Sequence, residues 1–126
     1  MKSLCLIDDD AIYLMLVKRL ISFNGFSSEI LEFSDGQEAF TKLKAIHLTG
    51  EPLPEVIFLD VNMPIWDGWD FLDEFMKLGL EKYPDVYIVT SSTHSMEKEK
   101  ALSYPIVRDC LVKPFEMDVL KNILNP

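Results

Sequence analysis

The chain has little of several features that would mark a specialised class of protein. Its 126 residues include only two cysteines and five glycines, and 12 lysines and arginines face 21 acidic residues, a net charge of −9. Cys5 and Cys110 lie inside apolar runs without a framework spacing, so we expect buried, reduced thiols. An acidic chain repels phosphate backbones and anionic lipid, which argues against binding to nucleic acid or to a membrane surface.

Long apolar runs are also missing. No stretch approaches the ~18 apolar residues of a membrane-spanning helix, and the N-terminus lacks the pattern of a signal peptide. Hydrophobic residues make up 48% of the chain and charged residues 26%, an ordinary globular mixture. The length fits one domain. We therefore expect a single soluble, cytoplasmic domain over residues 1–126.

Short apolar runs alternate with longer stretches of helical period. The apolar runs are predicted strands, and they cover residues 4–7, 29–33, 56–59, 86–89 and 107–112. Most are continuous, as in strands buried on both faces, whereas residues 29–33 alternate and indicate a more exposed strand. The helical period covers residues 11–23, 36–46, 69–80, 95–102 and 116–124. Asp10 is a plausible N-cap of the first helix, and Gly25 a plausible stop.

Five β-α units predict an α/β fold, a doubly wound five-stranded parallel sheet with helices on both faces and right-handed crossovers. In open sheets of this kind, ligands bind beyond the carboxyl ends of the strands, where the strand order reverses. For the order 2-1-3-4-5, the first and third strands are neighbours at that point.

Polar side chains stand at the carboxyl ends of four predicted strands. They are Asp8 and Asp9 after the first strand, Asp60 after the third, Thr90 after the fourth and Lys113 after the fifth. Three carboxylates that converge in one crevice repel each other unless a cation neutralises them. Oxygen ligands in small number favour Mg²⁺ over a softer metal.

Each of these residues alone has an ordinary structural explanation. Asp60 could serve a turn, Thr90 could satisfy a strand end, and Lys113 could be a solvated charge. One N-cap needs one side chain, so capping does not explain Asp8 and Asp9 together. The joint placement at four strand ends is what favours a functional site.

Four motifs occur together: LIDDD at residues 6–10, FLDVNMP at 58–64 with Asp67-Gly68 after it, IVTS at 88–91 and LVKPF at 111–115. In these motifs, in their order and in their spacing, the chain resembles the receiver domain of two-component response regulators, of the stand-alone type. The resemblance covers essentially the whole chain. It implies a flavodoxin-like fold with five helices.

The resemblance also implies a role for each residue at the strand ends. Asp60 corresponds to the phospho-acceptor, which takes a phosphoryl group from a histidine kinase or a histidine phosphotransfer protein. Thr90 matches the hydroxyl that moves to the phosphoryl group, and Lys113 the cation that pairs with its oxygens. The implied ligands of Mg²⁺ are Asp8, Asp9, Asp60 and the backbone carbonyl of Asn62.

The implied function is a phosphorylation-gated switch rather than an enzyme with a separate substrate. Because the chain ends two residues after its last predicted helix, we expect no output domain and a signal that leaves through a partner protein. The family binds such partners on a face that corresponds here to residues 95–104, the fifth strand and the last helix. We expect a monomer or weak dimer, and a cis bond between Lys113 and Pro114, as is common in the family.

Two features depart from the family pattern. Cys110 stands where receivers usually carry a tyrosine or phenylalanine, and residues 103–107 lack the usual Gly-Ala turn. A cysteine is too small to reproduce an aromatic swing. We therefore expect the activation signal to run from residues 90–92 into the helix at 95–102. Trp69 is expected to pack as a helix residue, and Trp66 to be partly exposed.

Two other functional classes are less compatible with the sequence. A phosphohydrolase that forms an aspartyl-phosphate would need a second acid beside Asp60, where the chain reads Asp60-Val61-Asn62. A flavin-binding electron carrier would need a phosphate-binding loop rich in glycine and hydroxyls after the first strand, where three acids stand. Exposure to a small phosphodonor with Mg²⁺ would separate all three classes.

Overall fold

The computed structural model describes residues 2–25, 29–91, 95–113 and 117–124. The strands are β1 (Leu4–Ile7), β2 (Ile30–Phe33), β3 (Val56–Asp60), β4 (Asp85–Thr90) and β5 (Val107–Val112). The helices are α1 (Ala11–Asn24), α2 (Gly36–Leu48), α3 (Gly68–Met76), α4 (Ser95–Leu102) and α5 (Met117–Leu124). They alternate along the chain as the sequence predicts.

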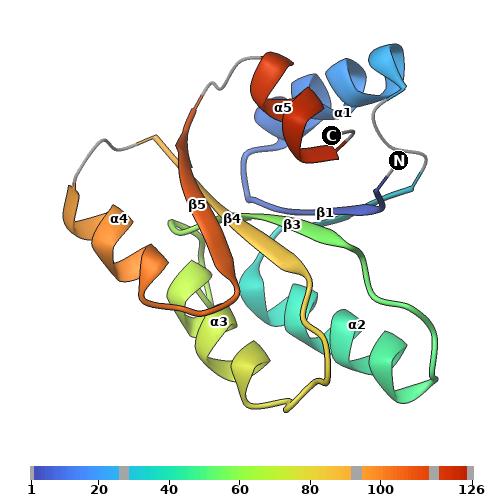
Figure 1. Ribbon diagram of the computed structural model, residues 1–126, viewed down its shortest axis with the longest axis vertical. Coiled ribbons are helices and arrows are strands. Elements are labelled where there is room, and N and C mark those ends of the chain that lie inside the picture. Colours follow the sequence, from blue (N-terminus) through green and yellow to red (C-terminus); the bar gives the residue numbers. More distant parts are fainter. Residues whose placement is uncertain (1, 26–28, 92–94, 114–116, 125–126) are drawn as a thin grey trace.

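The strands form one parallel sheet in the order β2-β1-β3-β4-β5. Helices α1 and α5 cover one face, and α2, α3 and α4 cover the other (Figure 1). The predicted doubly wound fold is therefore confirmed. Because β1 and β3 are neighbours and Ile7 pairs with Leu59, the carboxyl ends of the two strands lie side by side.

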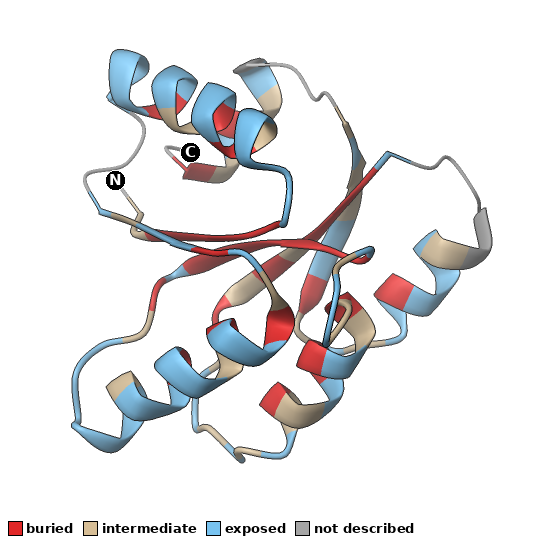
Figure 2. Cartoon of the chain, turned by 180° about the vertical axis from the view of Figure 1, so that it is seen from behind, coloured by how far each residue is buried: buried red, intermediate tan, exposed pale blue. Residues whose placement is uncertain are grey.

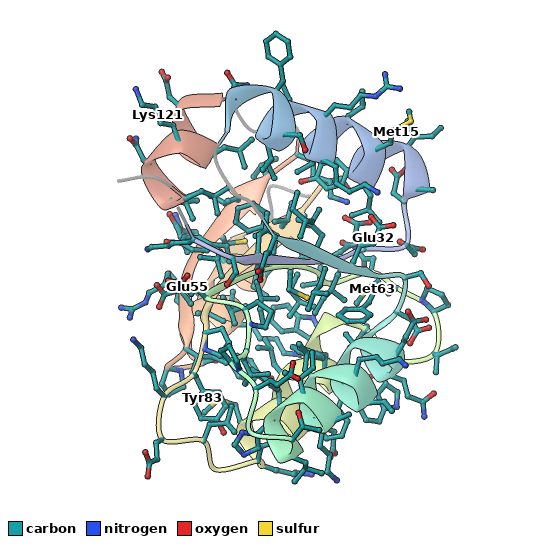
Figure 3. The ribbon with its side chains drawn as sticks, turned by 90° about the vertical axis from the view of Figure 1, so that its right-hand side faces the viewer. Met15, Glu32, Glu55, Met63, Tyr83 and Lys121 are labelled. Atoms are coloured by element: carbon teal, nitrogen blue, oxygen red, sulfur yellow. The ribbon has the colours of Figure 1, made fainter. Side chains whose placement is uncertain are left out.

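Burial follows the sequence pattern in β1, β2 and β3, whereas the edge strand β5 exposes Arg108, Asp109 and Val112. Every residue of β1 and β3 is buried, whereas the edge strand β2 exposes Leu31 and Glu32 (Figure 2). Side chains fill the space on both sides of the sheet in two apolar clusters (Figure 3). One lies under α2, α3 and α4 around Phe71 and Phe75, and the other lies under α1 and α5 around Leu14 and Leu120.

The first helix lies between the two predicted bounding residues, Asp10 and Gly25, and runs one residue past the predicted end, to Asn24. An Asp10 carboxylate oxygen accepts hydrogen bonds from the N–H groups of Ile12 and Tyr13, both at 3.1 Å, and so satisfies two donors of the first turn. Gly25 ends the helix with a φ of 65°, in the left-handed region that glycine enters without strain.

Helix α3 is shorter than predicted. The apolar period extends to residue 80, but the helix ends at Met76. The hydroxyl of Tyr83 donates a hydrogen bond of 2.8 Å to the Met76 carbonyl, and it accepts one of 3.3 Å from the N–H of Leu80. A side chain from the following loop thus replaces the next helical turn. Gly79, with a φ of 63°, turns the chain away.

Of the two thiols, only Cys5 is fully buried, so the expectation of burial is wrong for Cys110, which is half-buried on β5. Trp66 and Trp69 are both partly exposed, and Trp69 packs against the α2–α3–α4 side of the core as expected. The Lys113–Pro114 bond lies outside the described residues. Within the described ranges, no helix has both the length and the apolar character needed to cross a membrane.

Candidate functional site

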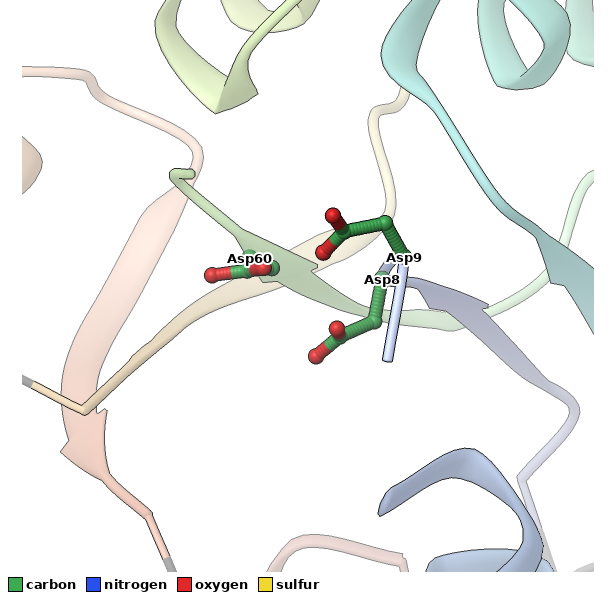
Figure 4. Close-up of side chains that lie close together, drawn as sticks. All are labelled: Asp8, Asp9 and Asp60. Atoms are coloured by element: carbon green, nitrogen blue, oxygen red, sulfur yellow. The ribbon is translucent and has the colours of Figure 1, made fainter. Parts of the chain in front are cut away.

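Three carboxylates meet at the carboxyl ends of β1 and β3. One oxygen from each of Asp8, Asp9 and Asp60 lies within 4.8 Å of the others (Figure 4). Asp8 and Asp60 are only 3% and 6% exposed, whereas Asp9 is exposed to solvent. We call these three residues the acidic cluster.

The backbone holds the two buried carboxylates in place. The N–H of Asp10 donates to Oδ1 of Asp8 at 2.9 Å, and the N–H of Asn62 donates to Oδ1 of Asp60 at 3.3 Å. In each case the donor lies two residues further along the chain. The orientation of both side chains is therefore set by the turn that follows the strand.

The loop after β3 folds back on Asp60. Gly68 lies so close that an added Cβ would stand 2.6 Å from the Asp60 carbonyl oxygen and 2.9 Å from the Val61 Cα. Its N–H donates to the Val61 carbonyl at 3.1 Å. Between them, the exposed Ile65 has a φ of 67°, a costly conformation for a β-branched residue. The sequence motif here reflects a backbone contact that only glycine permits.

Lys113 brings a positive charge to the acidic cluster. Its Nζ lies 2.6 Å from Oδ2 of Asp8 and 4.0 Å from Oδ2 of Asp60. Its backbone N–H donates to the Thr90 carbonyl at 2.7 Å, which fixes the end of β5 beside the end of β4. Among the residues that the structure describes, one cation thus faces three carboxylates, and these residues carry an excess of negative charge.

The negative charge around Asp60 contributes to a raised pKa of its carboxyl group. Burial, and then the charge of Asp8, raise the pKa of Asp60 to about 7, although Lys113 and the Asn62 N–H oppose the shift. A second cation would restore the ionised form. The donor set consists of hard carboxylate oxygens close together, which fits Mg²⁺.

Thr90 lies at the buried end of β4, and its hydroxyl points to a helix. It is 1% exposed, and its Oγ1 donates to Oε2 of Glu97 on α4 at 3.2 Å. Asn62 is exposed, and its backbone N–H donates to Asp60. Thus Asp8, Asp9, Asp60 and Lys113 meet in one place. The Thr90 side chain contacts α4 instead.

Sequence reasoning missed two residues beside the site. Glu97 carries no motif, and only its place in the first turn of α4 brings it to Thr90. Tyr13 lies in the first turn of α1, and its ring centroid is 4.2 Å from Nζ of Lys113. The position of Tyr13, three residues after the N-cap Asp10, is the signal that could have identified it.

Aromatic contacts hold α4 and the segment after it against α3. The rings of Trp69 and Tyr104 stack with centroids 6.1 Å apart, and Nζ of Lys100 lies 4.6 Å from the Trp69 centroid. The Tyr104 hydroxyl donates to Asp73 on α3 at 2.7 Å. Tyr104 thus fills the region in which the sequence lacks a small Gly-Ala turn.

Known proteins resemble the chain over nearly its whole length. A family model described as the response regulator receiver domain matches residues 4–125. A solved two-component response regulator from Cytophaga hutchinsonii is 30% identical with a TM-score of 0.86, over 98% of this chain and 93% of that one. The chemotaxis protein CheY of Thermotoga maritima is 28% identical, over 98% of this chain and 95% of CheY. The sensor protein EvgS of Escherichia coli is 29% identical, but the chain spans only 9% of its length.

Proposed function

The chain belongs to the response regulator receiver domain family, whose members act as signalling switches, and from this premise we propose that Asp60 is its phospho-acceptor. The donor is a histidine kinase or a histidine phosphotransfer protein. The chain then signals through a partner protein in the cytoplasm, as a monomer or weak dimer. The similarity to EvgS, a sensor protein, and to LuxN of Vibrio harveyi, a sensor kinase/phosphatase, supports a donor of this class.

The observation that carries the proposal is the convergence of Asp8, Asp9 and Lys113 on Asp60. In the transfer, an oxygen of Asp60 forms a bond to phosphorus while the phosphorus–nitrogen bond of the donor breaks, and the freed imidazole takes up a proton. Such a transfer depends on positioning and on neutralising the oxygens of the phosphoryl group. Lys113 supplies one positive charge.

The remaining neutralisation calls for a metal ion, and the receiver family binds Mg²⁺ at an acidic site. We propose that Asp8, Asp9 and Asp60 hold it, together with the backbone carbonyl of Asn62. When bound, Mg²⁺ would neutralise the transferring oxygens and keep Asp60 ionised. With its pKa at about 7, the metal-free carboxyl is partly protonated at neutral pH and is then a poor nucleophile.

We propose that the signal leaves through Thr90. A phosphoryl group on Asp60 offers new acceptor oxygens, and the Thr90 hydroxyl can turn to them only by leaving Glu97. This change releases the first turn of α4. The partner then binds the output face, which we define as residues 95–104, β5 and α5.

The test is phosphorylation of the wild-type chain by acetyl phosphate with Mg²⁺, followed by intact mass. We expect a single added phosphoryl mass that chelation of Mg²⁺ prevents. Asp60→Asn should gain none. Asp118→Asn, which alters an exposed acid on α5, should gain as much as the wild type. Phosphorylation of Asp60→Asn, or indifference to chelation, would contradict the proposal.

A further inference from the structure

We propose that Tyr13 is a positioning residue whose ring holds the ammonium of Lys113 at the acidic cluster. The inference rests on the proposed function, because it gives Tyr13 a part in phosphoryl transfer to Asp60. Tyr13 belongs to none of the four motifs that identify the family.

Lys113 reaches the acidic cluster from the end of β5, and three groups of the described part of the chain lie near its Nζ. Oxygens of Asp8 and Asp60 lie 2.6 and 4.0 Å away, and the Tyr13 ring centroid lies 4.2 Å away. A cation over an aromatic face at this distance is attracted by the negative charge of the ring face. The Lys113 side chain is only 16% exposed, so this attraction acts with little competition from water.

The Tyr13 ring itself is well anchored. Its backbone N–H is bound by the N-cap Asp10 in the first turn of α1, and its side chain packs against the cluster under α1 and α5. The same turn follows directly on Asp8 and Asp9. One rigid segment of the chain therefore positions both the carboxylates and the ring.

The contact with the ring restricts a side chain that is otherwise flexible. Its side chain has four rotatable bonds and a strongly hydrated ammonium, so attraction to two carboxylates alone leaves many rotamers that point to water. The ring of Tyr13 adds a third contact to the same ammonium. It thereby restricts Lys113 to positions from which it can meet oxygens added to Asp60.

The ring face, rather than the hydroxyl, carries this role. Phenylalanine keeps the face and should replace tyrosine, whereas leucine keeps the apolar bulk but loses the face. Tyr87 provides a matched control, because it packs against the same cluster from β4 and its ring partner is Phe58 rather than Lys113. Tyr87→Leu removes a similar aromatic side chain without touching the ammonium.

The experiment measures the rate of phosphorylation by acetyl phosphate at fixed Mg²⁺. We expect Tyr13→Leu to lower the rate by about 3- to 10-fold, the range that a partly buried cation–π contact implies. Tyr13→Phe and Tyr87→Leu should stay within about twofold of the wild type. In a Lys113→Met background, Tyr13→Leu should have no further effect, because the ammonium through which Tyr13 acts is gone.

A second measurement reads the contact without phosphorylation. In the wild type and in Tyr13→Phe, the ε-methylene protons of Lys113 should show a ring-current shift in NMR spectra that is absent in Tyr13→Leu. The inference is overturned if the shift is missing in the wild type, if Phe and Leu slow transfer equally, or if the effect persists without Lys113. A wild-type chain that gains no phosphoryl group would overturn the proposed function and this role with it, whereas normal transfer by Tyr13→Leu would overturn this role alone.

Discussion

The acidic cluster and the output face lie at neighbouring strand ends but are held in different ways. Backbone N–H groups orient Asp8 and Asp60, and Gly68 presses the following loop against β3. On the output face, the contacts of α4 run through side chains, as between Thr90 and Glu97 or Lys100 and Trp69. A group fixed by backbone stays where its strand puts it, whereas a helix held by side chains shifts when one contact changes. A switch needs both behaviours.

The largest loss of stability should come from a substitution in the loop that packs against Asp60. Gly68→Ala places a Cβ 2.6 Å from the Asp60 carbonyl oxygen, which is backbone and cannot easily move. We expect a loss of about 3 kcal/mol in the free energy of unfolding, measured by chemical denaturation, and slower phosphorylation. Gly50→Ala is the control, because its φ of 80° strains alanine but the space around it is open. That variant should lose roughly 1 kcal/mol. Equal losses would show that close packing on Asp60 does not matter.

The next largest change in stability should come from the binding of Mg²⁺ to the acidic cluster. Mg²⁺ at 100 times its dissociation constant should raise the free energy of unfolding by about 2.7 kcal/mol, if it does not bind the unfolded chain. Asp9→Ala should stabilise the metal-free protein slightly, because a repelling charge is gone, and should lose most of the response to Mg²⁺. Thermal melts with and without the ion measure both. Equal shifts in the two proteins would contradict the site.

The pH dependence of stability tests the same crowding without metal. The pKa of Asp60 rises from 3.8 to about 7 on folding, so its contribution to stability is fully present below pH 4 and is lost as the pH rises through 7. Asp60→Asn has no such loss. With no divalent cation, it should match the wild type near pH 4 and exceed its free energy of unfolding by on the order of 2 kcal/mol at pH 6. A difference that does not change with pH would show that Asp60 ionises freely.

The smallest effect should come from the output face. Tyr104→Phe keeps the stack on Trp69 but loses the hydrogen bond to Asp73. We expect a loss of about 1 kcal/mol in the free energy of unfolding and faster hydrogen exchange in α4. The rate of phosphorylation should be unchanged, because the acidic cluster is held independently. A slower rate in this variant would show that the two regions are not separable.

The sequence predicts the site better than its surroundings, for a physical reason. The carboxyl ends of parallel strands meet at one edge, so Asp8 and Asp60 could be placed together from local patterns and strand order alone. The contact between Tyr13 and Lys113 joins two elements a hundred residues apart in the chain and leaves no periodic trace. Likewise the early end of α3 depends on Tyr83, a loop residue whose hydroxyl binds a helix carbonyl. The half-burial of Cys110 depends on the neighbours of β5, which its apolar run does not reveal.

We expect phosphorylation of Asp60 to move the output face while the acidic cluster stays in place. Hydrogen exchange of the wild-type chain, with Mg²⁺ and with or without acetyl phosphate, tests this most directly, with Asp60→Asn as the control. We predict that the exchange of residues 95–104 and β5 changes on phosphorylation, that β1 and β3 keep their protection, and that exchange in Asp60→Asn does not respond to acetyl phosphate. Exchange that changes only around Asp60 and is unaltered across residues 95–104 would contradict the account.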